Sequence, residues 1–194
     1  MSRRFFNGLI SLVLLAGSLA VTSPGATGAS TAEKKHGLVQ VGEQAPDFTL
    51  PAQDGTSVSL KEFRGKKAVV LCFYPKDDKL VCKKEACLIR DSYSQFVDAG
   101  AEVLGVSADS LESHRAFVSK RNLPYRLLSD RDGSVRKLYG IPKAAGGLLH
   151  DRVTFVIDKD GTVRLAHRSL MNAEEHVSEA LRVLKTIDSP VKDK

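Results

Sequence analysis

The feature that most constrains the fold is a six-residue apolar run, Ala68–Phe73, that leads through a proline loop into a helix carrying two cysteines. The run shows no alternation of apolar and polar residues, which indicates a strand covered on both faces. Such a strand needs other layers above and below it. The chain is therefore predicted to fold as a layered α/β domain.

Four segments are predicted to form helices. The first is expected from residue 81 to about residue 99, ended by a glycine, with one apolar face formed by Cys82, Ala86, Ile89, Tyr93 and Phe96. The second is expected to be capped by Asp109 and a glutamate three residues further on, as a capping box. A short helix over residues 135–139 and a final helix capped by Asn172 complete the set.

Strands and turns are predicted between these helices. The expected strands are residues 47–50, 57–60, 68–73, 102–107, 127–128, 152–157 and 162–166. Asp54-Gly55 joins the first two into a hairpin, and residues 158–161 join the last two. Residues 140–151 are expected to form a loop. Strands that alternate with helices, together with closing hairpins, predict an α/β sandwich with a mixed sheet.

The helix that follows the proline loop begins next to Cys82, and Cys87 lies five residues further on. Free backbone N–H groups at a helix start carry partial positive charge, which favours a thiolate over a thiol. Lysines 79, 83 and 84 add to this positive field. The second thiol could trap an oxidised Cys82 as a disulfide, so the pair indicates redox chemistry.

The three cysteines also have two plainer explanations. Free cysteines are often inert core residues, and this explanation is preferred for Cys72, which stands alone inside the predicted buried strand. A zinc site would need a pair with closer spacing, and the five histidines are scattered without ligand spacing. No metal, haem or nucleotide motif is present in the sequence, so no cofactor is expected.

The N-terminal segment has the composition of an export signal. Residues 1–32 contain no acidic residue, Arg3 and Arg4 open the chain, and a 13-residue apolar stretch follows from Leu9 to Val21. This stretch is shorter than the about 20 residues that a membrane span needs. A Sec or twin-arginine signal over residues 1–29 is predicted, with a periplasmic destination. An organelle transit peptide and an uncleaved anchor are the alternatives.

The remaining chain is divided into a lead-in over residues 30–38, a domain over residues 39–186 and a polar tail over residues 187–194. The formal net charge of +6 is mild, and basic residues alternate with acidic ones along the chain. This pattern gives no support to nucleic-acid binding. No stable membrane association is expected after signal removal, and a monomer or weak dimer is expected.

The chain resembles the peroxiredoxins of the alkyl hydroperoxide reductase C and thiol-specific antioxidant superfamily. Within them it is most similar to the group called peroxiredoxin Q or bacterioferritin comigratory protein. The resemblance covers roughly residues 39–186. Its motifs are Gly42-x-x-Ala45-Pro46-Asp47-Phe48-Thr49-Leu50, Phe73-Tyr74-Pro75-Lys76-Asp77, Glu85-Ala86-Cys87-x-x-Arg90-Asp91, Leu128-Ser129-Asp130, Tyr139-Gly140 and Arg152-Val153-Thr154-Phe155-Val156-Ile157-Asp158. It implies a thioredoxin-like three-layer sandwich with an N-terminal hairpin.

The resemblance also implies a thiol-dependent peroxidase and a role for five residues. Cys82 matches the peroxidatic cysteine, which becomes a sulfenate, and Cys87 the resolving cysteine that forms a disulfide with it. Arg152 matches the arginine beside the thiolate, Glu85 the acid that orients this arginine, and Pro75 the proline that shields the pocket. Hydrogen peroxide and small organic hydroperoxides are the implied substrates, and a thioredoxin-like protein is the implied reductant.

The sequence departs from the family pattern beside Cys82. Where the family has Thr-Pro-Gly-Cys-Thr, this chain has Lys79-Leu80-Val81-Cys82-Lys83. An ammonium group donates hydrogen bonds but cannot accept them as a threonine hydroxyl does. Lys79 either weakens the alignment of peroxide or points to solvent while backbone groups bind peroxide. Asp151, which stands where a glycine is usual, is a further candidate to pair with Arg152 and hold it away from the thiol.

The helix itself sets a limit on disulfide formation. Residues five apart are rotated by about 140° net and separated by a rise of about 7.5 Å, which places their Cα atoms roughly 8–9 Å apart. A disulfide spans at most about 7 Å between Cα atoms. The first turn is therefore expected to unwind after oxidation, before Cys87 can reach Cys82.

Two other functions stay open from the sequence. A thiol–disulfide oxidoreductase would use the same fold, although its usual C-x-x-C spacing is replaced here by C-x-x-x-x-C. A redox-responsive binding protein without turnover would follow if Lys79 disables the peroxide site.

Overall fold

Strand β3 (Ala68–Phe73) is buried along its whole length, as the apolar run predicts. It forms the centre of a five-stranded sheet with the order β5-β4-β3-β8-β9. β3 pairs in parallel with β4 (Ala101–Ser107) and antiparallel with β8 (Val153–Ile157). β5 (Arg126–Ser129) lies parallel to β4, and β9 (Val163–Arg168) antiparallel to β8. The sheet is mixed, as predicted.

The computed structural model describes residues 37–147 and 149–187. The predicted signal over residues 1–29, almost all of the lead-in and residues 188–194 of the tail lie outside the described residues. Val39, at the predicted start of the domain, is buried with 4% of its surface exposed. Among the helices of the described part, none is long and apolar enough to span a bilayer.

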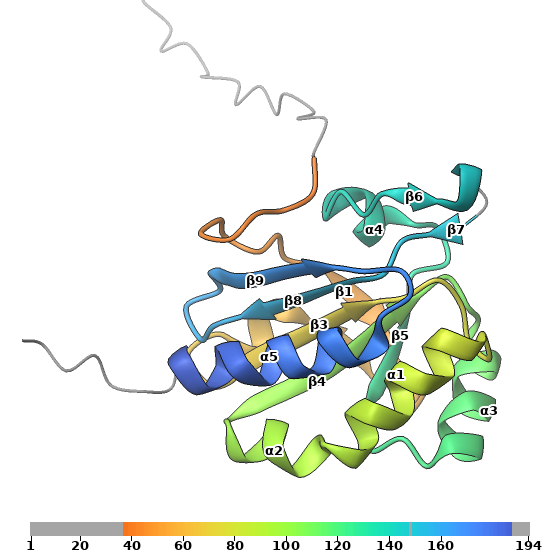
Figure 1. Ribbon diagram of the computed structural model, residues 1–194, viewed down its shortest axis with the longest axis horizontal. Coiled ribbons are helices and arrows are strands. Elements are labelled where there is room, and N and C mark those ends of the chain that lie inside the picture. Colours follow the sequence, from red (N-terminus) through yellow and green to blue (C-terminus); the bar gives the residue numbers. More distant parts are fainter. Residues whose placement is uncertain (1–36, 148, 188–194) are drawn as a thin grey trace, which may run out of the picture. The chain divides into compact units, whose positions relative to one another are not determined.

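Helices cover one face of the sheet (Figure 1). Alternate side chains of β3 pack into two different apolar clusters, one on each face. Val70 and Cys72 pack with helices α1 (Leu80–Asp91), α2 (Tyr93–Asp98), α3 (Leu111–Arg121) and α5 (Ala173–Ile187). Val69 and Leu71 pack with the hairpin of β1 (Thr49–Pro51) and β2 (Ser57–Ser59), the short helix η1 (Leu60–Phe63) and α4 (Ser134–Leu138). This confirms the predicted three-layer α/β sandwich with an N-terminal hairpin.

The helix expected from residue 81 to about residue 99 is two helices. α1 and α2 are separated at Ser92, whose backbone angles are φ −103° and ψ 8°. The predicted apolar face is kept across the break, with Cys82, Ala86, Ile89 and Phe96 buried. The predicted glycine stop is Gly100, which adopts a left-handed φ of +63°.

The predicted cap of α3 is wrong. Ser110 caps this helix, because its Oγ accepts a hydrogen bond from the Ser113 amide at 3.2 Å. The Asp109 carboxylate is instead occupied by the Asp77 amide at 2.8 Å and the Ser107 hydroxyl at 2.7 Å. The predicted cap of α5 is confirmed, since Asn172 Oδ1 accepts from the Glu175 amide at 3.5 Å.

The segment predicted as a loop over residues 140–151 contains a small ribbon. β6 (Lys143–Ala144) pairs antiparallel with β7 (Leu149–His150), and the turn between them includes η2 (Ala145–Gly147). These strands are two residues long each, too short to leave a periodic pattern in the sequence.

Candidate active site around Cys82

Cys82 is the third residue of α1 and is buried, with 3% of its surface exposed. The loop between β3 and α1 delivers it to the carboxyl end of the central strand. Lys79 is the N-cap residue, and its carbonyl accepts the Lys83 amide at 2.8 Å. The amides of the first turn, which precede this bond, have no carbonyl one turn earlier in the helix, so their partial positive charge is directed toward the start of α1.

Arg152 contacts the same sulfur from the residue that directly precedes β8. Phe73 and Val153 are paired across β3 and β8, so the residue just before β8 lies beside the loop that leaves β3. Arg152 Nη2 donates a hydrogen bond to Cys82 Sγ at 3.0 Å. The guanidinium is 1% exposed, so little water screens its charge.

Glu85 holds this arginine in place. It lies one turn after Cys82 on α1, is buried, and its Oε2 forms an ion pair with Arg152 Nη1. Arg152 Nε also donates to the Leu170 carbonyl at 3.5 Å. The guanidinium is thus fixed by a carboxylate and a carbonyl while its remaining nitrogen faces the sulfur, a geometry that the fork of an arginine provides and a lysine does not.

A buried histidine lies behind this group and was not found from the sequence. His176 Nε2 contacts the Ser169 carbonyl at 2.7 Å, and because a carbonyl only accepts, Nε2 carries the proton. Its Nδ1 then accepts the Thr154 hydroxyl at 2.8 Å and stands 3.9 Å from Glu85 Oε1. Burial lowers the pKa of His176 from 6.5 to about 4, so the ring is neutral near pH 7.

Cys87 lies on the same unbroken helix, half-buried, and all three cysteines are free thiols. Because α1 is continuous over residues 80–91, the Cα atoms of Cys82 and Cys87 stand roughly 8–9 Å apart, farther than the about 7 Å that a disulfide can span. In this form of the protein, Cys82 and Cys87 cannot be joined.

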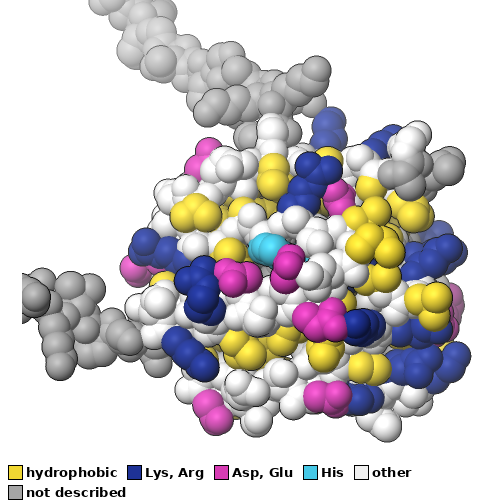
Figure 2. All heavy atoms as spheres, in the orientation of Figure 1, with side chains coloured by type: hydrophobic (Ala, Val, Ile, Leu, Met, Phe, Trp, Pro, Cys, Tyr) yellow, Lys and Arg dark blue, Asp and Glu magenta, His cyan; other side chains and the backbone are white. Residues whose placement is uncertain are grey.

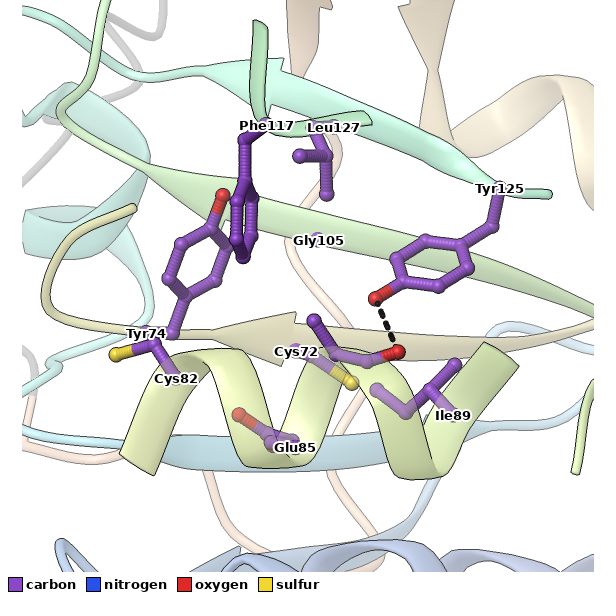
Figure 3. A pocket seen from close by; sticks show the side chains of 10 residues that line it. Cys72, Tyr74, Cys82, Glu85, Ile89, Gly105, Phe117, Tyr125 and Leu127 are labelled. Carbon is purple, nitrogen blue, oxygen red and sulfur yellow. Dashed lines mark hydrogen bonds between the residues drawn. The ribbon is translucent and has the colours of Figure 1, made fainter. Parts of the chain in front are cut away.

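Cys72 is a buried core residue, as predicted. It is 4% exposed, and burial raises the pKa of its thiol to about 11. With Cys82, Tyr74 and Leu127 it lines a cavity between α1 and the sheet (Figure 3). A larger residue at Gly105 would force its neighbours to move, since a Cβ at this position would lie 2.6 Å from the Leu127 side chain and 3.3 Å from the Tyr74 ring.

The other sequence expectations at the site have different outcomes. Asp151 does not hold Arg152 away from the thiol, because its carboxylate pairs with Arg168 Nε and accepts the Arg152 amide. Lys79 is exposed to solvent, in agreement with the second of its two proposed placements. Pro75 is half-buried in the loop between β3 and α1, and its shielding role stays a prediction.

Basic and acidic side chains are interspersed on the face shown in Figure 2. Within residues 37–147 and 149–187, no group of three or more histidine, cysteine or acidic side chains is placed to hold a metal ion.

Comparison with known proteins matches residues 41–166 to the AhpC/TSA family. The chloroplastic peroxiredoxin Q of Sedum lineare is 47% identical over 149 residues, which cover 77% of this chain and 80% of that protein. The chloroplastic peroxiredoxin Q of Arabidopsis thaliana is 50% identical over 147 residues, 76% of this chain and 68% of that protein.

Solved structures give the same result. The peroxidoxin BcpB of Mycobacterium tuberculosis aligns with a TM-score of 0.72 at 35% identity, covering 79% of this chain and all of that one. Peroxiredoxin Q of Xanthomonas campestris aligns with a TM-score of 0.68 at 29% identity, covering 73% and 92%. Sequence, fold and the thiol–arginine geometry agree, and the chain belongs to the AhpC/TSA family as a peroxiredoxin of the Q type, a thiol-dependent peroxidase.

Proposed function

We propose that Cys82 is the peroxidatic cysteine of this enzyme and that Cys87 resolves it. The observation that carries this assignment is the 3.0 Å contact from Arg152 Nη2 to Cys82 Sγ at the start of α1. A guanidinium beside the sulfur and the amides of the helix start both stabilise the thiolate, which is the nucleophilic form.

In the first step, the Cys82 thiolate attacks one oxygen of the peroxide bond. The S–O bond forms as the O–O bond breaks, the sulfur loses two electrons, and the departing alkoxide or hydroxide takes up a proton from solvent. Arg152 can donate to an oxygen of the peroxide as negative charge develops there. Because Glu85 keeps the guanidinium oriented, no reorganisation is needed when the bond breaks.

In the second step, the Cys87 thiol attacks the Cys82 sulfenic acid, which forms the disulfide and releases water. The first turn of α1 must unwind for this step, as the helix geometry requires. A dithiol protein of the thioredoxin type then reduces the disulfide by two exchange steps and restores both thiols.

The proposed substrates are hydrogen peroxide and small organic hydroperoxides. A bacterioferritin comigratory protein from Xanthomonas campestris, 30% identical and aligned with a TM-score of 0.67, is described by its alkyl peroxide reduction activity. The buried position of Cys82 supports small substrates over bulky ones, and Pro75 is proposed to limit the access of water.

Rapid mixing with hydrogen peroxide tests the assignment. The wild type should be oxidised fast and should form an intramolecular disulfide, Cys82→Ser should lose the reaction, and Cys87→Ser should accumulate a sulfenic acid that dimedone traps. If Cys82→Ser consumes peroxide as fast as the wild type, the assignment is wrong. Insulin reduction without peroxide consumption would instead favour a thiol–disulfide oxidoreductase.

We also infer that residues 1–29 direct the protein to another compartment. The basic start and apolar stretch support this, and several relatives are named as chloroplastic. Periplasmic export is the proposed destination and organelle import the alternative. Fusion of residues 1–32 to a reporter, followed by cell fractionation and N-terminal sequencing, distinguishes the two and locates the cleavage site.

A further inference from the structure

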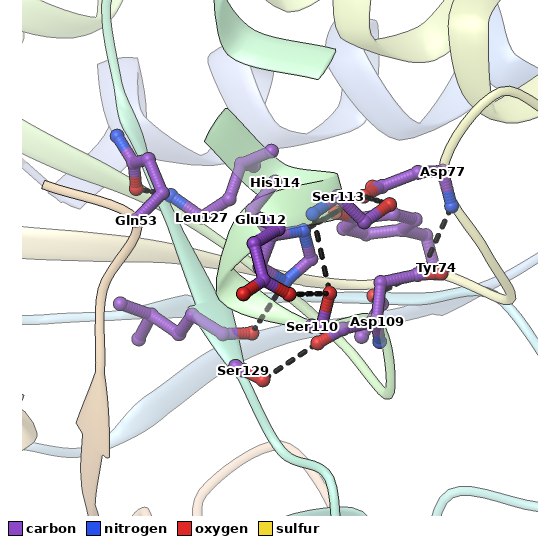
Figure 4. A network of polar contacts seen from close by, with 12 residues as sticks. Gln53, Tyr74, Asp77, Asp109, Ser110, Glu112, Ser113, His114, Leu127 and Ser129 are labelled. Carbon is purple, nitrogen blue, oxygen red and sulfur yellow. Dashed lines mark hydrogen bonds and ion pairs between the residues drawn. The ribbon is translucent and has the colours of Figure 1, made fainter. Parts of the chain in front are cut away.

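The loop that leads from β3 to Cys82 is held by a second buried polar group, which is centred on Asp77 (Figure 4). Asp77 is 6% exposed although it is a carboxylate in a loop. Its Oδ1 accepts the Tyr74 hydroxyl at 2.8 Å, and its Oδ2 accepts the Ser113 hydroxyl at 2.7 Å. Its amide donates to Asp109 Oδ2 at 2.8 Å. The chain is therefore fixed at Asp77 by both backbone and side chain.

His114 of α3 completes this attachment. The ring is fully buried, its Nδ1 lies 2.9 Å from Asp77 Oδ2, and its Nε2 lies 3.3 Å from the Leu128 carbonyl of β5. Both oxygens are acceptors, so the ring links the loop carboxylate to β5 through its two nitrogens. Burial alone would raise the pKa of Asp77, but the hydrogen bonds that it accepts from His114, Ser113 and Tyr74 lower this pKa below its ordinary value.

From Asp78 onward the chain is held less tightly than at Asp77. Asp78 has a left-handed φ of +58°, which a non-glycine residue adopts at an energetic cost, although Asp and Asn tolerate it better than others. Its carboxylate makes long contacts of 3.7 and 3.8 Å to Lys120 and Arg121. Leu80, the first residue of α1, is 81% exposed. A tightly fixed residue is thus followed at once by a strained turn and a loosely packed helix start.

We propose that the Asp77–His114 pair is the fixed anchor, and Asp78 the hinge, of the opening that brings Cys82 to Cys87. This proposal rests on the proposed function, because the opening matters only if the two cysteines must meet. Asp77 and His114 are positioning residues, since they contact the loop and not the reacting atoms. In the closed form the contacts of the anchor hold the loop where the helix start requires it, and they weaken when the first turn leaves, so they keep the closed helix populated for the reaction with peroxide. The hinge sets how readily the first turn leaves.

The rates of the peroxide step and of disulfide formation depend differently on the population of the open form. Peroxide reacts with the closed form, and the disulfide forms from the open form. When the open form is a small minority, a tenfold rise in its population raises disulfide formation about tenfold, while the closed fraction, and hence the peroxide step, falls less than twofold. A residue that supports only overall stability would change neither rate well below the melting temperature.

The hinge is tested with two substitutions at one exposed position. Asp78→Ala removes the tolerance for a left-handed backbone and should speed disulfide formation about fivefold, measured by stopped-flow fluorescence and quenched-flow mass analysis after one equivalent of hydrogen peroxide. Asp78→Asn keeps that tolerance and loses the charge, so disulfide formation should stay within twofold of the wild type. The peroxide step should change less than twofold in both.

The anchor is tested with His114→Gln, which can satisfy one of the two acceptors but not both. It should speed disulfide formation about tenfold and slow the peroxide step less than twofold. Glu102→Gln is the matched control. Glu102 forms an ion pair with Lys67 at the start of β4, whereas the contacts of Asp77 lie beyond the end of this strand. This variant should lower the melting temperature and leave both rates unchanged.

Unchanged disulfide formation in both Asp78→Ala and His114→Gln would overturn the proposal, as would an equal acceleration in Glu102→Gln. Failure of the proposed function looks different, since no variant, including the wild type, would then form the Cys82–Cys87 disulfide. If His114→Gln does not fold, the exposed Asp78 pair of variants still decides the hinge.

Discussion

At the scale of single residues, Arg152 is expected to dominate the peroxide step. Its guanidinium donates to Cys82 Sγ while a second nitrogen pairs with Glu85, and a lysine has no fork to do both. Arg152→Lys should therefore slow oxidation of Cys82 by about 100-fold, the usual loss on removal of one preorganised donor. Stopped-flow mixing with hydrogen peroxide measures this rate directly.

The control for this variant is Arg164→Lys. Arg164 is a half-exposed arginine on β9 paired with Asp158, on the same sheet as β8 but outside the site. It should change the oxidation rate less than twofold. A comparable loss in both variants would show that Arg152 acts through general stability and not through the sulfur.

Lys79 is expected to have little effect on the oxidation rate of Cys82, although it stands where the family has a threonine. It is exposed, whereas the sulfur is contacted by the buried Arg152. Lys79→Thr should change the oxidation rate of Cys82 less than threefold at moderate ionic strength, where an exposed charge is largely screened. A gain of tenfold or more would show that the lysine does disturb peroxide binding.

What the sequence could predict at this scale depended on distance along the chain. Cys82 and Cys87 share one helix, and their spacing shows a redox pair directly. Arg152 lies 70 positions from Cys82 and looks like any strand-edge arginine, so only the family resemblance identified it. His176 and Asp77 were missed, because a buried polar residue is recognised by partners that the fold supplies.

At the scale of elements, α1 is expected to lose its first turn on oxidation. The Lys83 amide is bonded to the Lys79 carbonyl at 2.8 Å in the reduced protein. After one equivalent of hydrogen peroxide, hydrogen exchange at Lys83 should become fast, while the β3 amides, which lie in the buried centre of the sheet, stay protected. Cys87→Ser should keep Lys83 protected under the same treatment.

Persistent protection of Lys83 in the disulfide form would contradict this prediction. It would mean that the helix bends elsewhere, and Ser92 is the place to look next, since α1 already ends there with non-helical angles. Exchange rates across residues 88–94 would reveal such a change.

The elements themselves were predicted well where the local pattern is strong. β3 was recognised because both of its faces are buried, and the α1–α2 apolar face because it has helical spacing. The break at Ser92 leaves that spacing intact and so escaped prediction. The Asp109 cap failed because the Asp77 amide, 32 residues away, claims its carboxylate.

At the scale of the whole molecule, the sheet order assembles the site. β3 is flanked by β4 on one side and β8 on the other, although β8 follows β3 by some 80 residues. Antiparallel pairing brings the start of β8 to the end of β3, and with it Arg152 to the start of α1. Strand order could not be read from local patterns, since several topologies bury the same strands.

The last expectation concerns folding stability in acid. Burial lowers the pKa of His176 to about 4 from its ordinary 6.5, so the unfolded chain binds a proton that the folded chain excludes. By linkage, stability that is present above pH 6.5 is lost as the pH falls toward 4, by about 3 kcal/mol in total. Urea unfolding at pH 7 and pH 4.5 measures most of this loss.

His176→Gln isolates the contribution, because a glutamine amide can donate to the Ser169 carbonyl and accept from Thr154 without taking up a proton. Its free energy of unfolding should fall less between pH 7 and pH 4.5 than that of the wild type. His150→Gln serves as comparison, since burial lowers the pKa of this half-buried ring too, and it should recover a smaller part. Equal losses in the wild type and His176→Gln would place the acid sensitivity in the buried carboxylates instead, with Glu85 and its pairing to Arg152 as the first to examine.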